Sequence, residues 1–285
     1  MAVVELTAPA AGRRPVAELQ DVRRVYTMGT NQVRALDGIS VSFGAGEFWS
    51  IMGTSGSGKS TLLNILGCID RPSSGSYKVD GTDVADLDDD GLSELRGTRI
   101  GFVFQSFNLI PVLTAFENVE YPLILAGMDA DRRQRRVKRL MDAVGLEQRA
   151  HNRPGQLSGG QRQRVAIARA LARKPKLVIA DEPTANLDSQ TGAAIIALMR
   201  WMQQNFKISF IFSSHDHGLI KAADDLIVLR DGVIQSVRRK GEGPVASPAA
   251  LDPGAEPEPP PYWTADPGNP ANLAFLTEDT QTIEG

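Results

Sequence analysis

This chain of 285 residues has little cysteine and no strong excess of either charge. Its single cysteine, Cys68, excludes an intramolecular disulfide and a zinc site built on cysteines. Cys68 lies within an apolar run, so we expect a buried thiol rather than a reactive one. The 31 basic and 34 acidic residues leave a formal net charge of −3, which gives no general electrostatic reason to bind nucleic acid.

Long apolar runs are lacking as well. No stretch reaches the roughly 18–20 uninterrupted apolar residues that are needed to cross a bilayer. The first residues carry Glu5 and no basic region ahead of an apolar block, so they do not resemble a signal peptide. We therefore expect another chain to supply any membrane-spanning part of a functional complex.

Composition divides the chain into three parts. Residues 1–15 are rich in Ala and Pro, which predicts a flexible N-terminal arm. Residues 16–240 have the patterning of a folded domain. Residues 241–285 are proline-rich and mildly acidic, which predicts a disordered tail, with docking through Tyr262 and Trp263 as the alternative.

Short apolar runs alternate with helical segments in the folded part, which predicts a parallel-rich α/β sheet. Residues 39–43 and 47–52 flank Gly44-Ala45-Gly46, which favours a hairpin. We expect helices over 59–69 and 158–174, and a helical insertion over about 109–156. The expected strands are 16–26, 33–36, 39–43, 47–52, 77–79, 82–84, 100–104, 177–180, 208–213, 226–229 and 233–237.

Residues 53–60 form a complete G-x-x-x-x-G-K-[ST] phosphate loop directly after the strand 47–52. Its glycines allow backbone N–H groups to point inward at a polyphosphate. Lys59 is expected to reach the β- and γ-phosphates, and Ser60 to ligate Mg²⁺. The expected contacts with a nucleoside triphosphate are Gly53, Thr54, Ser55, Gly56, Ser57, Gly58, Lys59, Ser60 and Thr61.

Two carboxylates follow the buried strand 177–180. The carboxyl ends of parallel strands are where α/β sheets bind ligands, so Asp181 and Glu182 are placed for chemistry. We expect Asp181 to organise Mg²⁺ and Glu182 to polarise the attacking water.

A second phosphate-binding pattern stands at Leu157–Gln161, at the start of the predicted helix 158–174. Gly159 and Gly160 leave N–H groups free at a helix N-terminus, and Ser158 adds a hydroxyl. The segment therefore has the chemistry of an anion site.

Together these motifs resemble the nucleotide-binding subunits of ABC transporters. The resemblance covers about residues 19–237 and favours the group that serves lipoprotein-release, macrolide-export and cell-division permeases. Residues 52–66, 101–109, 154–171 and 180–188 agree with that group most closely, whereas Thr54 and Ala185 stand where it often has Pro and Gly. It implies a P-loop NTPase fold, a RecA-like parallel-rich sheet with an N-terminal antiparallel β-subdomain and an inserted α-helical subdomain.

The resemblance also implies roles for single residues. Tyr26 corresponds to the aromatic residue that stacks on adenine, and Gln105 to the glutamine that senses Mg²⁺ and links to the permease. His215 corresponds to the residue that contacts the γ-phosphate. Asp188 lies in the loop that crosses the dimer interface. The segment facing the partner's ATP consists of Ser158, Gly159, Gly160 and Gln161.

The implied function is ATP hydrolysis, with Glu182, His215 and Lys59 as catalytic residues. ATP and Mg²⁺ are the expected cofactors, and the metal ligands are Ser60, Gln105 and Asp181. The expected partners are a second copy of the chain and a permease on a separate chain, at the cytoplasmic face of the plasma (inner) membrane, with no nucleic acid. Two alternatives are a soluble ABC ATPase that acts on DNA or ribosomes, and a regulatory module that binds ATP without hydrolysis.

Two features of the helical insertion allow more than one interpretation. Its basic run, residues 132–139, suits anionic lipid headgroups, acidic loops of a partner or simply a solvated helix face. Its apolar segments, 107–113 and 116–125, suit docking of a cytoplasmic helix of the permease or the small core of the insertion itself.

Overall fold

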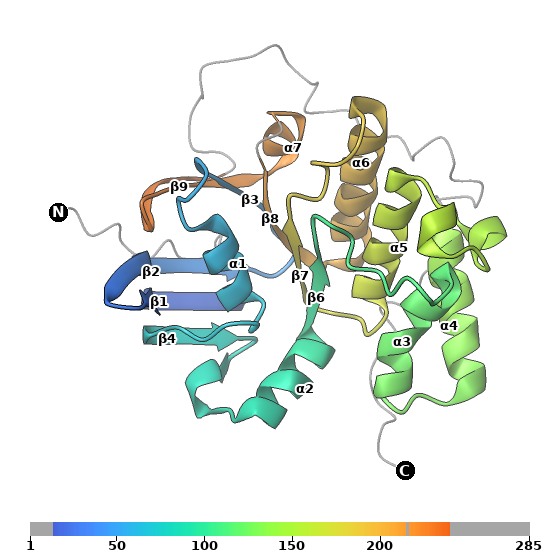
Figure 1. Ribbon diagram of the computed structural model, residues 1–285, viewed down its shortest axis with the longest axis horizontal. Helices are drawn as coiled ribbons and strands as arrows, with labels where there is room; N and C mark the ends of the chain where they lie inside the picture. Colours follow the sequence, from blue (N-terminus) through green and yellow to red (C-terminus); the bar gives the residue numbers. More distant parts are fainter. Residues whose placement is uncertain (1–13, 215–216, 240–285) are drawn as a thin grey trace.

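The computed structural model describes residues 14–214 and 217–239 (Figure 1). The strands β1 (Pro15–Met28), β2 (Asn31–Gly44), β4 (Ser74–Val79) and β5 (Thr82–Asp83) form an antiparallel sheet in the order β2-β1-β4-β5. The predicted N-terminal antiparallel unit is thus confirmed. The predicted arm before Arg14 and the predicted tail lie outside the described residues.

A six-stranded sheet forms the second layer, in the order β10-β9-β3-β8-β7-β6. All its neighbouring pairs are parallel except β9 and β10, which form the hairpin predicted around Asp231-Gly232. This confirms the parallel-rich sheet. Its strands are β3 (Phe48–Met52), β6 (Ile100–Val103), β7 (Leu177–Asp181), β8 (Ser209–Ser213), β9 (Asp225–Arg230) and β10 (Val233–Arg238).

The hairpin predicted from 39–43 and 47–52 is wrong. β2 runs unbroken to Gly44 and pairs with β1, whereas β3 lies in the other sheet between β9 and β8. The reason is burial: Phe48, Trp49 and Ile51 are all fully buried, which requires a central strand covered on both faces. The two short strands predicted near 33–43 are one strand, in which Gly38, at a φ of 84°, marks a break in register with β1.

The helices lie around the six-stranded sheet. Neither α2 nor α6 is predicted by the sequence, whereas α1 and α5 fall in predicted segments and α3 and α4 lie within the expected helical insertion. In the described ranges, no helix is both long and apolar enough to cross a membrane. The helices are α1 (Lys59–Leu66), α2 (Asp89–Arg99), α3 (Ala115–Leu125), α4 (Ala130–Ala143), α5 (Gly159–Leu171), α6 (Ser189–Phe206) and α7 (His217–Ala222), with 3₁₀ turns η1 (Val84–Asp86), η2 (Glu147–Arg149) and η3 (Pro154–Gln156).

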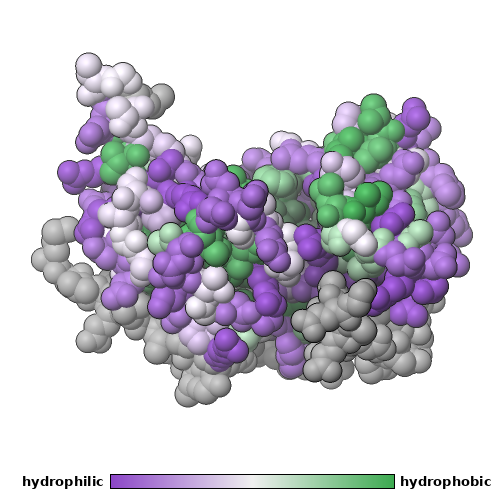
Figure 2. Space-filling view, turned by 90° about the horizontal axis from the view of Figure 1, so that it is seen from below, coloured by the Kyte–Doolittle hydropathy of each residue, from purple (hydrophilic) through white to green (hydrophobic). Residues whose placement is uncertain are grey.

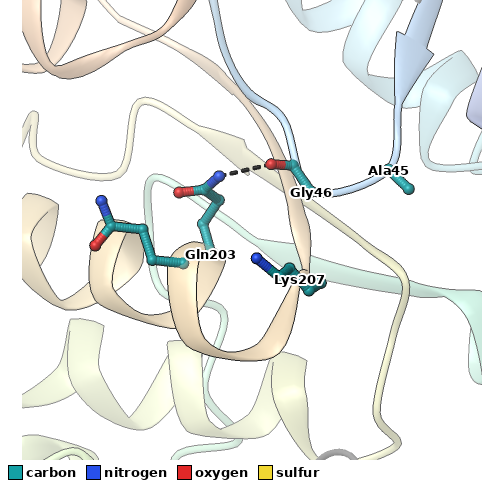
Figure 3. A pocket seen from close by; sticks show the side chains of 5 residues that line it. Ala45, Gly46, Gln203 and Lys207 are labelled. Carbon is teal, nitrogen blue, oxygen red and sulfur yellow. Dashed lines mark hydrogen bonds between the residues drawn. The ribbon is translucent and has the colours of Figure 1, made fainter. Parts of the chain in front are cut away.

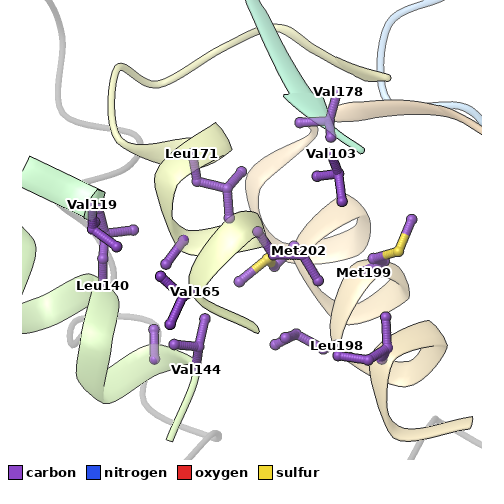
Figure 4. Close-up of a cluster of buried hydrophobic side chains, with 14 of the residues drawn as sticks. Val103, Val119, Leu140, Val144, Val165, Leu171, Val178, Leu198, Met199 and Met202 are labelled. Atoms are coloured by element: carbon purple, nitrogen blue, oxygen red, sulfur yellow. The ribbon is translucent and has the colours of Figure 1, made fainter. Parts of the chain in front are cut away.

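Both faces of this sheet carry a hydrophobic core. Successive residues of a strand point to opposite faces, and β7 shows the result. Leu177 and Ile179 join the core that includes α1, β1 and β2. Val178 and Ala180 join the core that includes α3, α4, α5 and α6 (Figure 4). The strand is therefore fixed from both sides, and its last residue is held at the edge where the chemistry is expected.

Candidate functional site

The loop between β3 and α1 closes around the head of a lysine. Lys59 Nζ donates to the carbonyl oxygens of Gly53 at 2.8 Å and Thr54 at 3.0 Å, and the residue is only 7% exposed. A polyphosphate in this loop would offer its own oxygens to the same ammonium group.

Two glycines of the loop have no space for a side chain. A Cβ at Gly53 would lie 2.3 Å from the carbonyl oxygen of Leu229, and one at Gly58 would lie 2.5 Å from that of Ala35. Gly58 also has a φ of 101°, a value that side chains rarely allow. The hydroxyl of Ser57 is buried and has no hydrogen-bond partner among the described residues. This cradle suits a ligand rich in acceptor oxygens.

The acidic pair lies at the end of β7, and the buried Ser213 at the end of β8 holds both of its members. Ser213 Oγ donates to Asp181 Oδ1 at 2.7 Å and accepts from the Glu182 N–H at 3.0 Å. Glu182 has a φ of 43°, an uncommon conformation that persists where neighbours fix it. The role of Ser213 is not predicted from the sequence, although a polar residue that ends a buried apolar strand is a usable signal.

Gln105 meets this pair from the next strand. Its side-chain Nε2 donates to Glu182 Oε2 at 3.2 Å, and its backbone carbonyl oxygen accepts from Asn186 Nδ2 at 3.0 Å. Since β6, β7 and β8 are neighbours, their carboxyl ends bring Gln105, Asp181 and Glu182 together. The structure thus collects an amide, two carboxylates and a hydroxyl at one edge of the sheet.

The segment Ser158–Gln161 starts α5 as expected. Ser158 caps the helix by accepting from the Gln161 N–H at 3.3 Å, and its own N–H donates to Gln161 Oε1 at 2.9 Å. Gly160 packs directly against α6, because a Cβ there would lie 2.3 Å from Thr191 Cγ2. A side chain at this position would push the two helices apart.

Asp188 caps α6 next to this segment. Its carboxylate accepts from the Thr191 N–H at 2.9 Å and from Thr191 Oγ1 at 2.6 Å. These hydrogen bonds, the side-chain one foremost, lower the pKa of Asp188. The neighbouring Leu187 lies beside Gly159, so the two segments predicted to face a partner are adjacent.

The phosphate loop and the segment Ser158–Gln161 of one chain lie apart. Figure 1 shows α1, which follows the phosphate loop, well apart from α5, which begins with the second segment. One chain therefore does not bring Ser158–Gln161 to its own phosphate loop.

Tyr26 lies on β1 in a charged setting. Its Oη donates to Asp70 Oδ2 at 2.8 Å, and the guanidinium of Arg24 lies 4.6 Å from the ring centroid. Arg24 also pairs with Asp70 at 2.8 Å, so the ring has neighbours that fix its orientation. No described contact links Tyr26 to the phosphate loop. His215, whose role is also implied by the resemblance, lies outside the described residues.

A pocket of about 330 Å³ lies elsewhere, between the β2–β3 connection and the end of α6 (Figure 3). In it Gln203 Nε2 donates to the Gly46 carbonyl at 2.6 Å. Gly46 precedes β3, whereas the phosphate loop follows β3. The pocket is therefore at the opposite end of the strand and does not belong to this site.

Comparison with known proteins gives one consistent result. A family model described as ABC transporter matches residues 36–185. An uncharacterized ABC transporter ATP-binding protein of Thermotoga maritima is 48% identical over 228 residues, which cover 80% of this chain and 97% of that protein. The macrolide export ATP-binding/permease protein MacB of Brucella melitensis is 49% identical over 78% of this chain. This chain covers only 34% of that protein's length.

A solved structure is similar along nearly its whole length. It is a dimeric structure of a post-hydrolysis state of the ATP-binding cassette MJ0796, a name also borne by a Methanocaldococcus jannaschii relative, bound to ADP and Pi. The TM-score is 0.73 at 44% identity, covering 78% of this chain and 98% of the other. The resemblance predicted from the sequence and the predicted fold class are both confirmed.

Proposed function

The chain belongs to the ABC transporter ATP-binding family and is an ATPase subunit of that type, and we propose that two copies bind two ATP molecules head to tail. Each site would combine the phosphate loop of one copy with Ser158–Gln161 of the other. The observation that carries this proposal is the separation of the two segments within one chain (Figure 1).

Each residue of the site has a proposed role. Lys59 and the loop amides would hold the phosphates, because the hydrogen bonds of the Lys59 ammonium group place it inside the phosphate loop. Glu182 would accept a proton from the attacking water, and Ser213 and Gln105 fix its position. His215 is proposed to stabilise charge on the γ-phosphate, and Tyr26 to stack on the adenine.

The donor set suits Mg²⁺. Ser60, Gln105 and Asp181 offer a hydroxyl, an amide oxygen and a carboxylate, and hard oxygen donors are what this ion prefers. Asp181 and Gln105 already lie in one hydrogen-bond network through Ser213 and Glu182. Bound there, the ion would neutralise charge on the phosphates during transfer.

The membrane partner is proposed to be a permease on a separate chain, with this subunit peripheral at the cytoplasmic face of the plasma (inner) membrane. Helix α3 and the turn before it expose Val112, Tyr121, Ile124 and Leu125, which are 42–70% exposed. Figure 2 shows hydrophobic patches on the side where Figure 1 places α3 and α4. Such a surface suits a cytoplasmic helix of the permease, while Val119 and Leu123 of the same helix pack in the core.

The proposed domain is residues 16–240, with the arm before it and the tail after it. The alternative, a soluble ABC ATPase on DNA or ribosomes, is disfavoured because the relatives are transporter components. The net charge of −3 agrees with this choice.

The test uses Glu182→Gln, which keeps the size of the side chain and removes the general base. The variant should bind ATP, lose turnover by at least about 100-fold, and shift on adding ATP from 30.8 kDa to twice that mass in light scattering. The control is Lys59→Ala, which should stay monomeric with ATP. A Glu182→Gln protein that turns over ATP normally would contradict the proposed role, as would one that stays monomeric.

A further inference from the structure

The loop that follows Gln105 has a backbone that is rare for its residues. Phe107 and Asn108 are consecutive, and both have positive φ, 64° and 46°. Asparagine tolerates this left-handed region, but a bulky phenylalanine seldom enters it. Such conformations persist where the surroundings hold them. Something outside the loop must therefore fix it.

Two arginines of α5 do so. Arg169 places one guanidinium nitrogen on the Asn108 carbonyl at 2.6 Å and the other on the Phe107 carbonyl at 2.8 Å. Arg162 lies over the Phe107 ring, 5.0 Å from its centroid, and Phe107 is only 8% exposed. Hydrogen bonds from charged donors are stronger than those from neutral ones, so we expect Arg169 to stabilise the loop more than Arg162 does.

The loop in turn positions the catalytic edge of the sheet. Gln105 is two residues before Phe107, and its amide donates to Glu182 Oε2 at 3.2 Å. Asn186 holds the carbonyl of Gln105 from the segment before α6. The backbone shape of the loop therefore sets where the Gln105 amide meets the carboxylate.

Helix α5 contains both Arg169 and most of the segment Ser158–Gln161. It begins at Gly159, and Arg169 lies about 15 Å further along its axis at 1.5 Å per residue. Val165, Ala168 and Leu171 bury the helix in the core, so it moves as a unit. A displacement at the first turn thus reaches the loop of Gln105 through Arg169.

We propose that Arg169 is a positioning residue that links Ser158–Gln161 to Gln105, so that engagement of α5 by the partner's nucleotide sets Gln105 and Glu182 in the chain's own site. This link rests on the proposed function. Arg169 acts through the Phe107 and Asn108 carbonyls that it binds.

The test compares Arg169→Met with a matched control in the full chain. Arg164 is also on α5 and also donates to loop carbonyls, those of Val144 at 2.9 Å and Gly145 at 3.4 Å, away from Gln105. Arg169→Met should lower kcat by about tenfold or more and raise the Mg²⁺ concentration for half-maximal rate several-fold. Arg164→Met should stay within about twofold of wild type in both.

Two further measurements separate positioning from folding. In the Glu182→Gln background, Arg169→Met should still form the ATP-dependent dimer, because the first turn of α5 is intact. Arg169→Lys replaces the two separate guanidinium nitrogens with one nitrogen on a shorter head group, so it should have a reduced kcat even if the methionine variant does not fold.

Wild-type kcat and Mg²⁺ dependence in Arg169→Lys would overturn the link, as would equal losses in Arg169→Met and Arg164→Met. Loss of the ATP-dependent dimer in Arg169→Met would assign the arginine to helix packing and also overturn the link. Failure of the proposed function would be distinguishable from failure of the link. In that case the Glu182→Gln protein, with Arg169 unchanged, would turn over ATP normally.

Discussion

Gly160 gives a prediction whose size follows from two contacts. In Gly160→Ala the new methyl would lie 2.3 Å from Thr191 Cγ2, far inside any real carbon–carbon contact. Thr191 cannot simply rotate away, because its Oγ1 donates to Asp188 at 2.6 Å. Either α5 and α6 separate or that hydrogen bond breaks.

Both responses destabilise the fold. Overpacking a core typically costs about 1–3 kcal/mol, and the other response gives up the Thr191 hydrogen bond to the exposed Asp188. Alanine's helix propensity offsets at most about 1 kcal/mol. We expect Gly160→Ala to lower the free energy of unfolding by about 1–2 kcal/mol, which is roughly 2–8 °C in Tm.

Two variants make this expectation specific. Gly159→Ala meets its first neighbour, Leu187 Cδ2, at 3.3 Å, and should be neutral or slightly stabilising. Thr191→Ser removes Cγ2 but keeps the hydroxyl, so it should restore most of the loss in a Gly160→Ala background. Thermal and urea unfolding give the stabilities of the wild type, the two single glycine variants and the Gly160→Ala/Thr191→Ser double variant. A Gly160→Ala protein as stable as wild type would refute the reasoning, as would a double variant that recovers nothing.

Three other predictions concern separate parts of the chain. Gly53→Ala should abolish ATP binding in calorimetry, because its Cβ would lie 2.3 Å from the Leu229 carbonyl; retained affinity would count against the cradle. The lowered pKa of Asp188 means that its cap stabilises the fold above the ordinary value of 3.8 and that this contribution is lost as pH falls toward the lower folded value. Asp188→Asn should flatten that part of the unfolding profile, and an unchanged acid limb would contradict this. Burial raises the pKa of Cys68 to about 12, so iodoacetamide should label it slowly at pH 8 and rapidly in urea, and fast native labelling would be the opposite result.

Local patterns in the sequence predict the phosphate loop, the acidic pair and the cap at Ser158, because each depends on residues within one turn or one loop. Lys59 is enclosed by carbonyls five and six residues away, and Ser158 is paired with Gln161. Burial patterns likewise predict β7 and β8, since their apolar runs need cover on both faces.

What the sequence does not predict depends on distant contacts. The path of β2 away from β3 is decided by pairing with β1 and with β8, and nothing local distinguishes it from a hairpin. Ser213 reaches Asp181 across 32 positions, and Arg169 reaches Phe107 across 62. Such partners are visible only once the strands and helices are assembled.

The most direct test of the composite site is the ATPase rate per molecule of the wild-type protein across a dilution series at saturating ATP and Mg²⁺. If each site borrows Ser158–Gln161 from a second copy, the rate per molecule falls as dilution separates the copies. A rate per molecule that stays constant while light scattering shows only the 30.8 kDa species would contradict the account.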